Sequence, residues 1–503
     1  MGLSRHTCVC ILIFVLGLAA FAQNQPAKSA EAKSGPDVSG EWQGKITNLR
    51  LVLNINRSED GALAGALKSI DQGNVTIPIQ TVSFQQASGT LRLELKLVGA
   101  VYEGKLNDDG SEIAGSWQQG GSSTALVFRR PGAAAKTTLK PVTIGKVPLT
   151  PCRTPDGNSE GLCGTYEVYE NREARSGRKI ALNIFVLPAL TDKPGAPLFP
   201  LAGGPGQSAV EAFPALGHIN KLRAQGDVVL VDQRGTGKSN LLQCQLRDPQ
   251  VAQSMVGDFF SFDRLNACRS ELEKRADLTR YTTSISADDV DEIRAALGYD
   301  KINVMGGSYG TREGLVYLHR HPEHVRTLTL EAVAPPQYKI PLAFAKTIQA
   351  SAEHLIEACG ADPACRKDFP NLKQEFKEVV ERLEKSSAHF ELQNAGKPQA
   401  VTLSRGAFIA HLRLVLYVPV LASQFPFMLH QAYQNDWTLY GAAVLRLNNM
   451  FEKVLARGMS FSVICAEDAK EMAAVSTPAA AGIMDAFTSW PPRIAKLKTR
   501  RIV

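Results

Sequence analysis

The segment Gly306-Gly-Ser-Tyr-Gly310 constrains the fold of this 503-residue chain more than any other. It directly follows the β-type run Ile302–Met305 and precedes a helical pattern over Thr311–Arg320 that stops before a proline. The glycines leave room for a sharp turn, in which the central serine takes a strained backbone conformation. Such a turn lifts the hydroxyl clear of the strand ends, at a helix N-terminus that favours negative charge. The pattern therefore predicts Ser308 as a nucleophile, with Gly306 and Gly310 as the glycines of its turn.

The residues around this turn predict an α/β domain that begins at about residue 150. Further strands are expected at Ile180–Leu187, Pro197–Leu201, Asp227–Asp232 and Arg326–Leu330. Strands that alternate with helices are typical of a parallel sheet with crossover helices. Ser286-Ala-Asp-Asp289 resembles a capping box that would start the helix before Ile302. We assign 150–339 to this core, 340–460 to a mostly helical cap, and 461–503 to a return to the core.

Residues 37–130 predict a separate all-β module. Leu49, Leu51, Leu53 and Ile55 recur at every second position, as do Leu91, Leu93, Leu95 and Leu97. Turn sequences such as Asp60-Gly61 and Asp109-Gly110 separate the strands. We expect a small up-and-down barrel or sandwich, similar to a lipocalin, which either binds a ligand in its mouth or serves as a docking module. Residues 131–149 are the expected linker.

The N-terminus matches a secretory signal. Arg5 precedes the apolar run Ile11–Leu18, and Ala20-Phe-Ala22 provides small residues at a cleavage site before Gln23. We expect residues 1–22 to be removed, 23–36 to form a disordered leader, and the mature protein to be secreted or periplasmic without a membrane span.

Of the nine cysteines, Cys8 and Cys10 lie inside the signal, which leaves seven in an oxidising compartment. The sequence does not fix their connectivity. Short loops close at low entropic cost, so proximity favours Cys152–Cys163, Cys244–Cys268 and Cys359–Cys365. Cys465 is then left over.

Two further glycine-rich segments bear on the chemistry. Leu201-Ala-Gly-Gly-Pro-Gly206 follows a predicted strand, where a backbone N–H of Gly203 or Gly204 would join that of Tyr309 in an oxyanion hole. Val231-Asp-Gln-Arg-Gly-Thr-Gly-Lys-Ser239 looks like a phosphate-binding loop, but Asp232 stands where that motif requires glycine. We therefore expect no nucleotide and no other cofactor.

Together, GGPG, DQRGTGKS, GGSYG and the segment Arg320-His-Pro-Glu-His-Val325 resemble the proline iminopeptidase and tripeptidyl aminopeptidase group of α/β-hydrolases. The resemblance covers about 150–503 and not the β-rich module. It implies an α/β-hydrolase fold with a helical cap, and an exopeptidase that removes residues from the N-termini of short or unfolded peptides. It also implies that Asp232 and Arg234 are structural.

The resemblance breaks off at the C-terminus. In the group, the triad acid and histidine follow the last two strands, beyond the cap, and this chain stops about where the first of those strands would begin. We therefore expect a C-terminally truncated relative that hydrolyses poorly, because a serine needs an adjacent base. Glu331 is an alternative acid, and the catalytic histidine is unassigned. The histidines after Ser308 are 319, 321, 324, 354, 389, 411 and 430. A non-catalytic relative or binding protein, and a carboxylesterase, are the alternative functions.

Two weaker sequence patterns bear on metal binding and on nucleic-acid binding. His319-Arg-His321-Pro-Glu-His324 is similar to H-x-H-x-D-H metal sites, but glutamate replaces aspartate and the segment overlaps a helix end, so we expect no metal. Arg493–Val503 holds five of the basic residues in a chain of net charge +7, and a short basic tail is usually solvated. We expect a peptide substrate and no nucleic-acid partner; oligomeric state and residue preference stay open.

Overall fold

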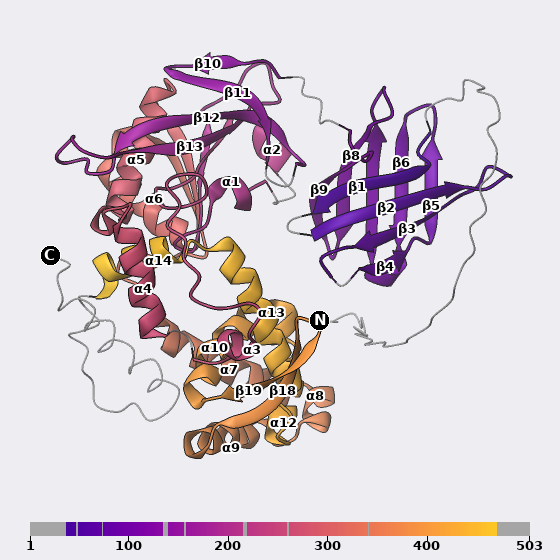
Figure 1. Cartoon of the computed structure of the whole chain (residues 1–503), viewed down its shortest axis with the longest axis vertical. Helices are drawn as coiled ribbons and strands as arrows, with labels where there is room; N and C mark the ends of the chain where they lie inside the picture. Colours follow the sequence, from indigo (N-terminus) through magenta and orange to yellow (C-terminus); the bar gives the residue numbers. More distant parts are fainter. Residues whose placement is uncertain are drawn as a thin grey trace.

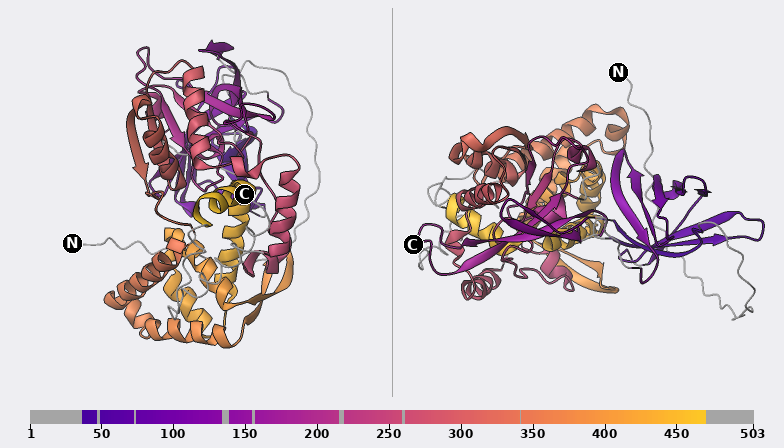
Figure 2. Two further views of the ribbon diagram at one scale, coloured as in Figure 1. Left: turned by 90° about the vertical axis from the view of Figure 1, so that its left-hand side faces the viewer. Right: turned by 90° about the horizontal axis from the view of Figure 1, so that it is seen from above.

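The computed structural model describes residues 37–469, except for 47–48, 73, 134–138, 155–156, 215–218, 259–260 and 341. An all-β module, an α/β core and a cap are visible (Figure 1), and the cap lies at one end of the core in Figure 1 and in the left-hand view of Figure 2. No helix in the described part of the chain combines the length and apolar character needed to cross a membrane. The predicted signal, leader and basic tail lie outside the described residues.

The N-terminal module is a nine-stranded antiparallel meander in the order β4-β3-β2-β1-β9-β8-β7-β6-β5. Its strands are β1 (Gly40–Ile46), β2 (Leu49–Arg57), β3 (Leu63–Ser69), β4 (Val75–Pro78), β5 (Thr81–Gln85), β6 (Thr90–Leu95), β7 (Ala100–Leu106), β8 (Glu112–Gln119) and β9 (Ser122–Arg129). Pairing of β1 with β9 curls the sheet around a core that contains Trp42 and Trp117. The predicted barrel-like module is therefore present.

One strand of this module ends earlier than its alternation predicts. Leu91, Leu93 and Leu95 are buried as expected, but Leu97 is 70% exposed. The chain leaves β6 after Leu95 and forms the 3-10 turn η1 (Lys96–Val98), which turns Leu97 away from the core. The alternation of leucines therefore continues one repeat, to Leu97, beyond the last residue of the strand.

The core contains an eight-stranded sheet in the order β10-β11-β12-β13-β15-β14-β16-β17. Its strands are β10 (Val142–Ile144), β11 (Val147–Arg153), β12 (Glu160–Tyr169), β13 (Lys179–Leu187), β14 (Leu198–Leu201), β15 (Val228–Val231), β16 (Ile302–Gly307) and β17 (Val325–Glu331). β14 to β17 are parallel, at the predicted places. The first four strands instead form an antiparallel meander without intervening helices, which corrects the expected alternation from residue 150.

Helices α5 (Thr283–Ala296) and α6 (Tyr309–Arg320) pack side by side on this sheet. Helix α5 begins earlier than the predicted capping box. Its N-cap is Thr282, whose hydroxyl accepts a hydrogen bond from the N–H of Ile285 at 3.4 Å. Ser286 and Asp289 lie inside the helix and are buried, because both have partners on neighbouring segments rather than on the helix end. The capping-box prediction is wrong.

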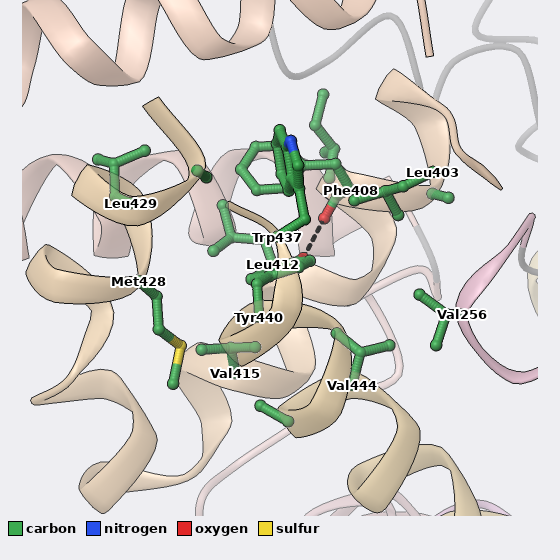
Figure 3. Close-up of a cluster of buried hydrophobic side chains, with 14 of the residues drawn as sticks. Val256, Leu403, Phe408, Leu412, Val415, Met428, Leu429, Trp437, Tyr440 and Val444 are labelled. Carbon is green, nitrogen blue, oxygen red and sulfur yellow. Dashed lines mark hydrogen bonds between the residues drawn. The ribbon is translucent and has the colours of Figure 1, made fainter. Parts of the chain in front are cut away.

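The cap is helical apart from one hairpin. Its elements are α7 (Leu342–Ala361), α8 (Pro363–Asp368), α9 (Leu372–Lys385), β18 (Ala388–Asn394), β19 (Lys397–Leu403), α10 (Arg405–Tyr417), α11 (Pro419–Ala422), α12 (Phe425–Tyr433) and α13 (Thr438–Val454). Phe408, Trp437 and Tyr440 form the centre of its core (Figure 3), where the Tyr440 hydroxyl donates to the Phe408 carbonyl at 2.6 Å. α14 (Arg457–Val463) and the π-helical turn η4 (Ile464–Asp468) then return to the core.

Segments outside the predicted cap also contribute to it. Helix α3 (Ala252–Val256) packs on β19 and α13, and the Ala252 N–H donates to Gln399 at 2.7 Å. Asn448 donates to the Met255 carbonyl at 2.6 Å. Helix α4 (Phe262–Glu273) follows α3 and contacts α14.

The described residues form three disulfides, Cys152–Cys163, Cys244–Cys268 and Cys359–Cys365, with Cα–Cα distances of 5.8, 5.7 and 5.1 Å. Cys465, in η4, is not among these six residues.

The β module is hydrogen-bonded to the core through the turn between β11 and β12. The Asn158 amide donates to the Lys45 carbonyl at 2.6 Å and accepts from the Val127 N–H at 3.0 Å. Arg129 donates to the Gly157 carbonyl at 2.9 Å. A cleft of about 660 Å³ lies beside this contact and is lined from both parts.

Candidate active site

Ser308 occupies a sharp turn between β16 and α6. It has φ 55° and ψ −121°, a conformation that costs a non-glycine residue free energy and is held by its surroundings. Its N–H donates to the Glu331 carbonyl at 3.0 Å, and its carbonyl accepts from the Thr311 hydroxyl at 2.6 Å. Backbone contacts therefore fix the turn from both sides.

The two glycines of the turn leave no room for a side chain. A β-carbon on Gly310 would lie 2.1 Å from the Leu201 carbonyl oxygen, and one on Gly306 would lie 2.3 Å from the Gly310 oxygen. Both contacts are far inside the van der Waals limit and involve backbone atoms. The motif's glycines are thus required by the close passage of β14, β16 and α6.

The predicted oxyanion loop lies against the serine. A β-carbon on Gly203 would lie 3.3 Å from that of Ser308. Tyr309 is the first residue of α6, so its N–H is among those without a partner in the helix itself. Gly204 follows with φ 111°. The Gly203 backbone and the start of α6 therefore lie beside Ser308, where the predicted oxyanion hole would form.

Sequence reasoning missed the element that holds this loop. The Ala456 N–H, just before α14, donates to the Gly206 carbonyl at 2.9 Å. The Ser460 hydroxyl, inside α14, donates to the Pro205 carbonyl. No local motif marks either residue, because the contact joins segments about 250 residues apart.

Asp232 and Arg234 act as structural anchors, in agreement with what the resemblance implies. The Asp232 carboxylate accepts from Ser208 at 2.6 Å and from Asn183 at 2.8 Å. Arg234 is fully buried and donates to both carboxylate oxygens of Asp289, at 2.6 and 2.8 Å. These bonds tie the loop after β15 to the residue that follows the oxyanion loop, to β13 and to α5.

A buried polar layer lies under the serine turn, on the first turns of α6. Arg312 donates to both oxygens of Asp468 at 3.1 Å, with side chains 2% and 0% exposed. The Tyr309 hydroxyl lies 2.7 Å from that of Thr283, which donates to Glu467 at 2.8 Å. This layer joins η4 to α5 and α6, and burial raises the pKa of the Tyr309 hydroxyl well above its usual value.

Glu313 is the most strongly perturbed carboxyl of this layer. It accepts a hydrogen bond from Ser286 at 2.6 Å and contacts the Gln233 amide. Burial raises the pKa of Glu313 to about 8, although the bond from Ser286 opposes the change. A neutral carboxyl at this depth can donate a proton of its own in the layer.

The later histidines have partners away from Ser308. His321 contacts Asp288, His324 contacts Asp291, His354 contacts Glu357, His389 contacts Thr402, His411 contacts the Gly257 carbonyl, and His430 contacts Glu375. His319 is exposed at the end of α6. Within the described ranges, none of them is hydrogen-bonded to Ser308. Burial lowers the pKa of His411 to about 3, so that this histidine is a neutral part of the cap core.

Glu331 approaches the serine with its backbone alone. Its carbonyl accepts from the Ser308 N–H at 3.0 Å, while its side chain is exposed at the end of β17. Its role as the acid stays a prediction.

An α/β hydrolase fold family model matches residues 197–367. Among curated relatives, the serine protease Hip1 of Mycobacterium tuberculosis is 32% identical over 243 residues, 44% of this chain and 46% of the relative. The tripeptidyl aminopeptidase of Streptomyces lividans is 35% identical over 159 residues, 27% of this chain and 28% of the relative. The proline iminopeptidase of Xylella fastidiosa is 28% identical over 139 residues, 28% of this chain and 33% of the relative.

The chain thus spans less than half the length of these relatives. Among solved structures, the esterase EaEST from Exiguobacterium antarcticum is 21% identical, with a TM-score of 0.22 over 38% of this chain and 57% of that one. That value is too low to transfer an activity. The residues that the family model matches include the glycine loop and the serine turn. The core therefore has the α/β-hydrolase fold, and part of its sequence is similar to three peptidases.

Proposed function

We propose that this chain is an exported serine aminopeptidase that releases residues from peptide N-termini through an acyl-enzyme on Ser308. The observation that carries the proposal is the strained serine at the N-terminus of α6, directly beside the backbone of Gly203. In the reaction, Oγ of Ser308 bonds to the scissile carbonyl carbon and the amide nitrogen leaves with a proton. Water then cleaves the ester.

The backbone would supply the electrostatic part of this chemistry. The N–H groups of Gly203 or Gly204 and of Tyr309 would stabilise the negative oxygen that develops on the carbonyl. The start of α6 adds the positive end of a helix dipole to the same place. Removing one such donor typically costs on the order of 10²–10³ in turnover.

The choice of substrate rests on the relatives. Two of them are named for aminopeptidase or iminopeptidase activity and one for serine protease activity. The cap over the core is a means of admitting only short or unfolded peptides. Hydrolysis through a serine needs no cofactor, but it does need a general base beside Ser308, and that base is unassigned.

Export is supported by the signal-like residues 1–22 and by the three disulfides, which persist in oxidising compartments. N-terminal sequencing of protein from the cell exterior or periplasm should give Gln23 as the first residue. A first residue of Met1 in cytoplasmic protein would contradict export.

Kinetics test the nucleophile and the substrate class together. The chain from Gln23 onward is assayed on tripeptidyl amides, aminoacyl amides and acyl esters, beside Ser308→Ala. If the chain is a serine peptidase, Ser308→Ala should turn over the amides on the order of 10⁴–10⁶ times more slowly than the wild type. Turnover of esters alone would favour the carboxylesterase.

That this chain hydrolyses poorly stays a prediction. It is tested by the ratio of turnover in the wild type to turnover in Ser308→Ala. Equal rates in the wild type and Ser308→Ala, at most about 10³ above the uncatalysed rate, would mean that no base reaches the serine. That result would favour the non-catalytic alternative, since an oxyanion hole without a working triad leaves a residual of about 10³ over water.

A further inference from the structure

The C-terminal end of α6 carries a cluster that the proposed peptidase chemistry does not use. One carboxylate oxygen of Asp291 and one ring nitrogen each of His321 and His324 lie within 4.8 Å of one another. His321 follows α6 directly, His324 ends the 3-10 turn η3 (Pro322–His324), and Asp291 comes from the middle of α5. The side chains are 16–26% exposed, so an ion could enter from solvent.

The distances suit a small divalent ion. His321 Nδ1 lies 3.7 Å from Asp291 Oδ2, and His324 Nδ1 lies 2.7 Å from Asp291 Oδ1. A tetrahedral zinc ion with bonds of about 2.1 Å holds its ligands about 3.4 Å apart. Small rotations of the carboxylate and one ring bring the three atoms to that spacing. A distance of 3.7 Å is also too long for a hydrogen bond between the first pair.

The outer contacts of His321 orient it for metal binding. Its Nε2 lies 3.0 Å from Asp288 Oδ1, and a carboxylate there selects the tautomer with a proton on Nε2. The lone pair of Nδ1 then faces the Asp291 carboxylate. Two acceptors that face each other need a cation or a proton between them. This carboxylate–histidine arrangement is the usual outer support of a metal-bound histidine.

Asp291 is oriented in the same way. Its Oδ1 accepts from Arg294 at 2.8 Å and from the Tyr317 hydroxyl at 3.0 Å. Its Oδ2 has a single longer contact with Arg294, at 3.4 Å, which leaves this oxygen for an ion. Glu323 lies 3.8 Å from His324 Nδ1, close enough to supply a fourth ligand in place of water.

The Arg294 guanidinium competes with a metal ion for the Asp291 carboxylate. Its Nη2 lies 3.3 Å from His324 Nε2, a contact that must open when Nδ1 binds a metal and Nε2 carries the proton. The guanidinium already supplies one positive charge to Asp291. Imidazole and carboxylate ligands in a half-buried site match zinc and similar transition ions better than calcium or magnesium.

We infer that Asp291, His321 and His324 form a zinc-type divalent metal site that fastens α5 to the end of α6. The inference departs from the sequence-based expectation of no metal, which rested on the histidine segment alone. The missing carboxylate is supplied by Asp291 from α5 rather than by the motif. The site is structural, since it lies at the opposite end of α6 from Ser308.

Zinc binding by the untagged chain tests the inference. After dialysis against a chelator, the chain is titrated with ZnCl₂ by calorimetry and by competition with a chromophoric chelator. We expect one zinc ion per chain at micromolar or tighter affinity, and a rise in Tm when zinc is added. His321→Gln and His324→Gln should each weaken binding at least about tenfold, and so should Asp288→Asn.

His354→Gln is the matched control, because the His354 side chain is 84% exposed on α7, where it contacts Glu357, and it lies outside the cluster. It should bind zinc as the wild type does. Circular dichroism and the Tm of each zinc-free variant separate lost binding from lost folding. The inference is overturned if the wild type binds no zinc, or if the double variant His321→Gln/His324→Gln binds as much as the wild type and shows the same rise in Tm.

Discussion

The two ends of helix α6 make opposite use of one element. At the N-terminus, backbone geometry dominates: a serine at φ 55° stands beside glycines, and the helix dipole favours an anion. At the C-terminus, side chains dominate: His319 and Arg320 occupy the last turn, and His321 follows at the end where the dipole favours a cation. A backbone-built site tolerates no added atom, whereas a side-chain-built site can be dismantled one group at a time.

The sharpest test of the backbone-built end is Gly310→Ala. Its β-carbon would lie 2.1 Å from the Leu201 carbonyl oxygen, and neither backbone can retreat without displacing the sheet. We expect a loss on the order of 5 kcal/mol in unfolding free energy, enough to leave little folded protein. Urea denaturation followed by circular dichroism measures it.

Gly360→Ala is the matched control, since Gly360 is also helical and an added β-carbon there meets nothing within 4 Å. It should gain up to about 1 kcal/mol through helix propensity. Equal stability of the two variants would show that the glycines of the turn are not sterically required.

The buried layer beneath the turn should respond next most strongly. Asp468→Asn removes the charge opposite Arg312, where the two side chains are 0% and 2% exposed. Arg312 then keeps only the more distant Glu467 carboxylate, at 3.6 Å, and breaking the closer buried pair should cost about 3 kcal/mol. Glu271→Gln breaks an exposed ion pair with Lys274 and should leave the urea midpoint unchanged. If the urea midpoint of Asp468→Asn falls no further than that of Glu271→Gln, the Arg312–Asp468 pair has no structural role.

Glu313→Gln tests the buried layer through the pH dependence of the unfolding free energy. The pKa of Glu313 is about 8 in the folded state, whereas the usual pKa of a glutamate, which applies to the unfolded state, is about 4.5. Between these two pH values the folded state keeps a proton that the unfolded state has lost. The stabilising contribution is complete below that lower value and is lost as pH rises through about 8. Between pH 6 and pH 7, the wild type should lose about 1.4 kcal/mol relative to Glu313→Gln. Parallel stability–pH curves for the two proteins would refute the raised pKa.

The same contrast explains what could be predicted from the sequence. The turn at Ser308 was predictable because the strand, the glycines and the helix are contiguous. Likewise, β2 was predictable because each of its buried residues obeys one local period. The start of α5 was mispredicted, since Ser286 and Asp289 are buried by Glu313 and Arg234, which the local pattern cannot reveal. The carboxylate beside His321 and His324 was missed for the same reason: it comes from another helix.

Tyr317→Phe gives the smallest expected effect and probes the side-chain-built end alone. The Tyr317 hydroxyl donates to Asp291 Oδ1 at 3.0 Å, so its removal costs one buried hydrogen bond, about 1 kcal/mol. It also frees the carboxylate to rotate, and zinc affinity should fall about tenfold. Tyr166→Phe is the control, because Tyr166 donates to the neighbouring Glu292 on α5 through a longer 3.3 Å bond outside the cluster. Calorimetry with ZnCl₂ on both variants compares them. If both bind zinc equally well, Tyr317 does not set the orientation of Asp291, and the carboxylate is positioned by its contacts with Arg294 and His324.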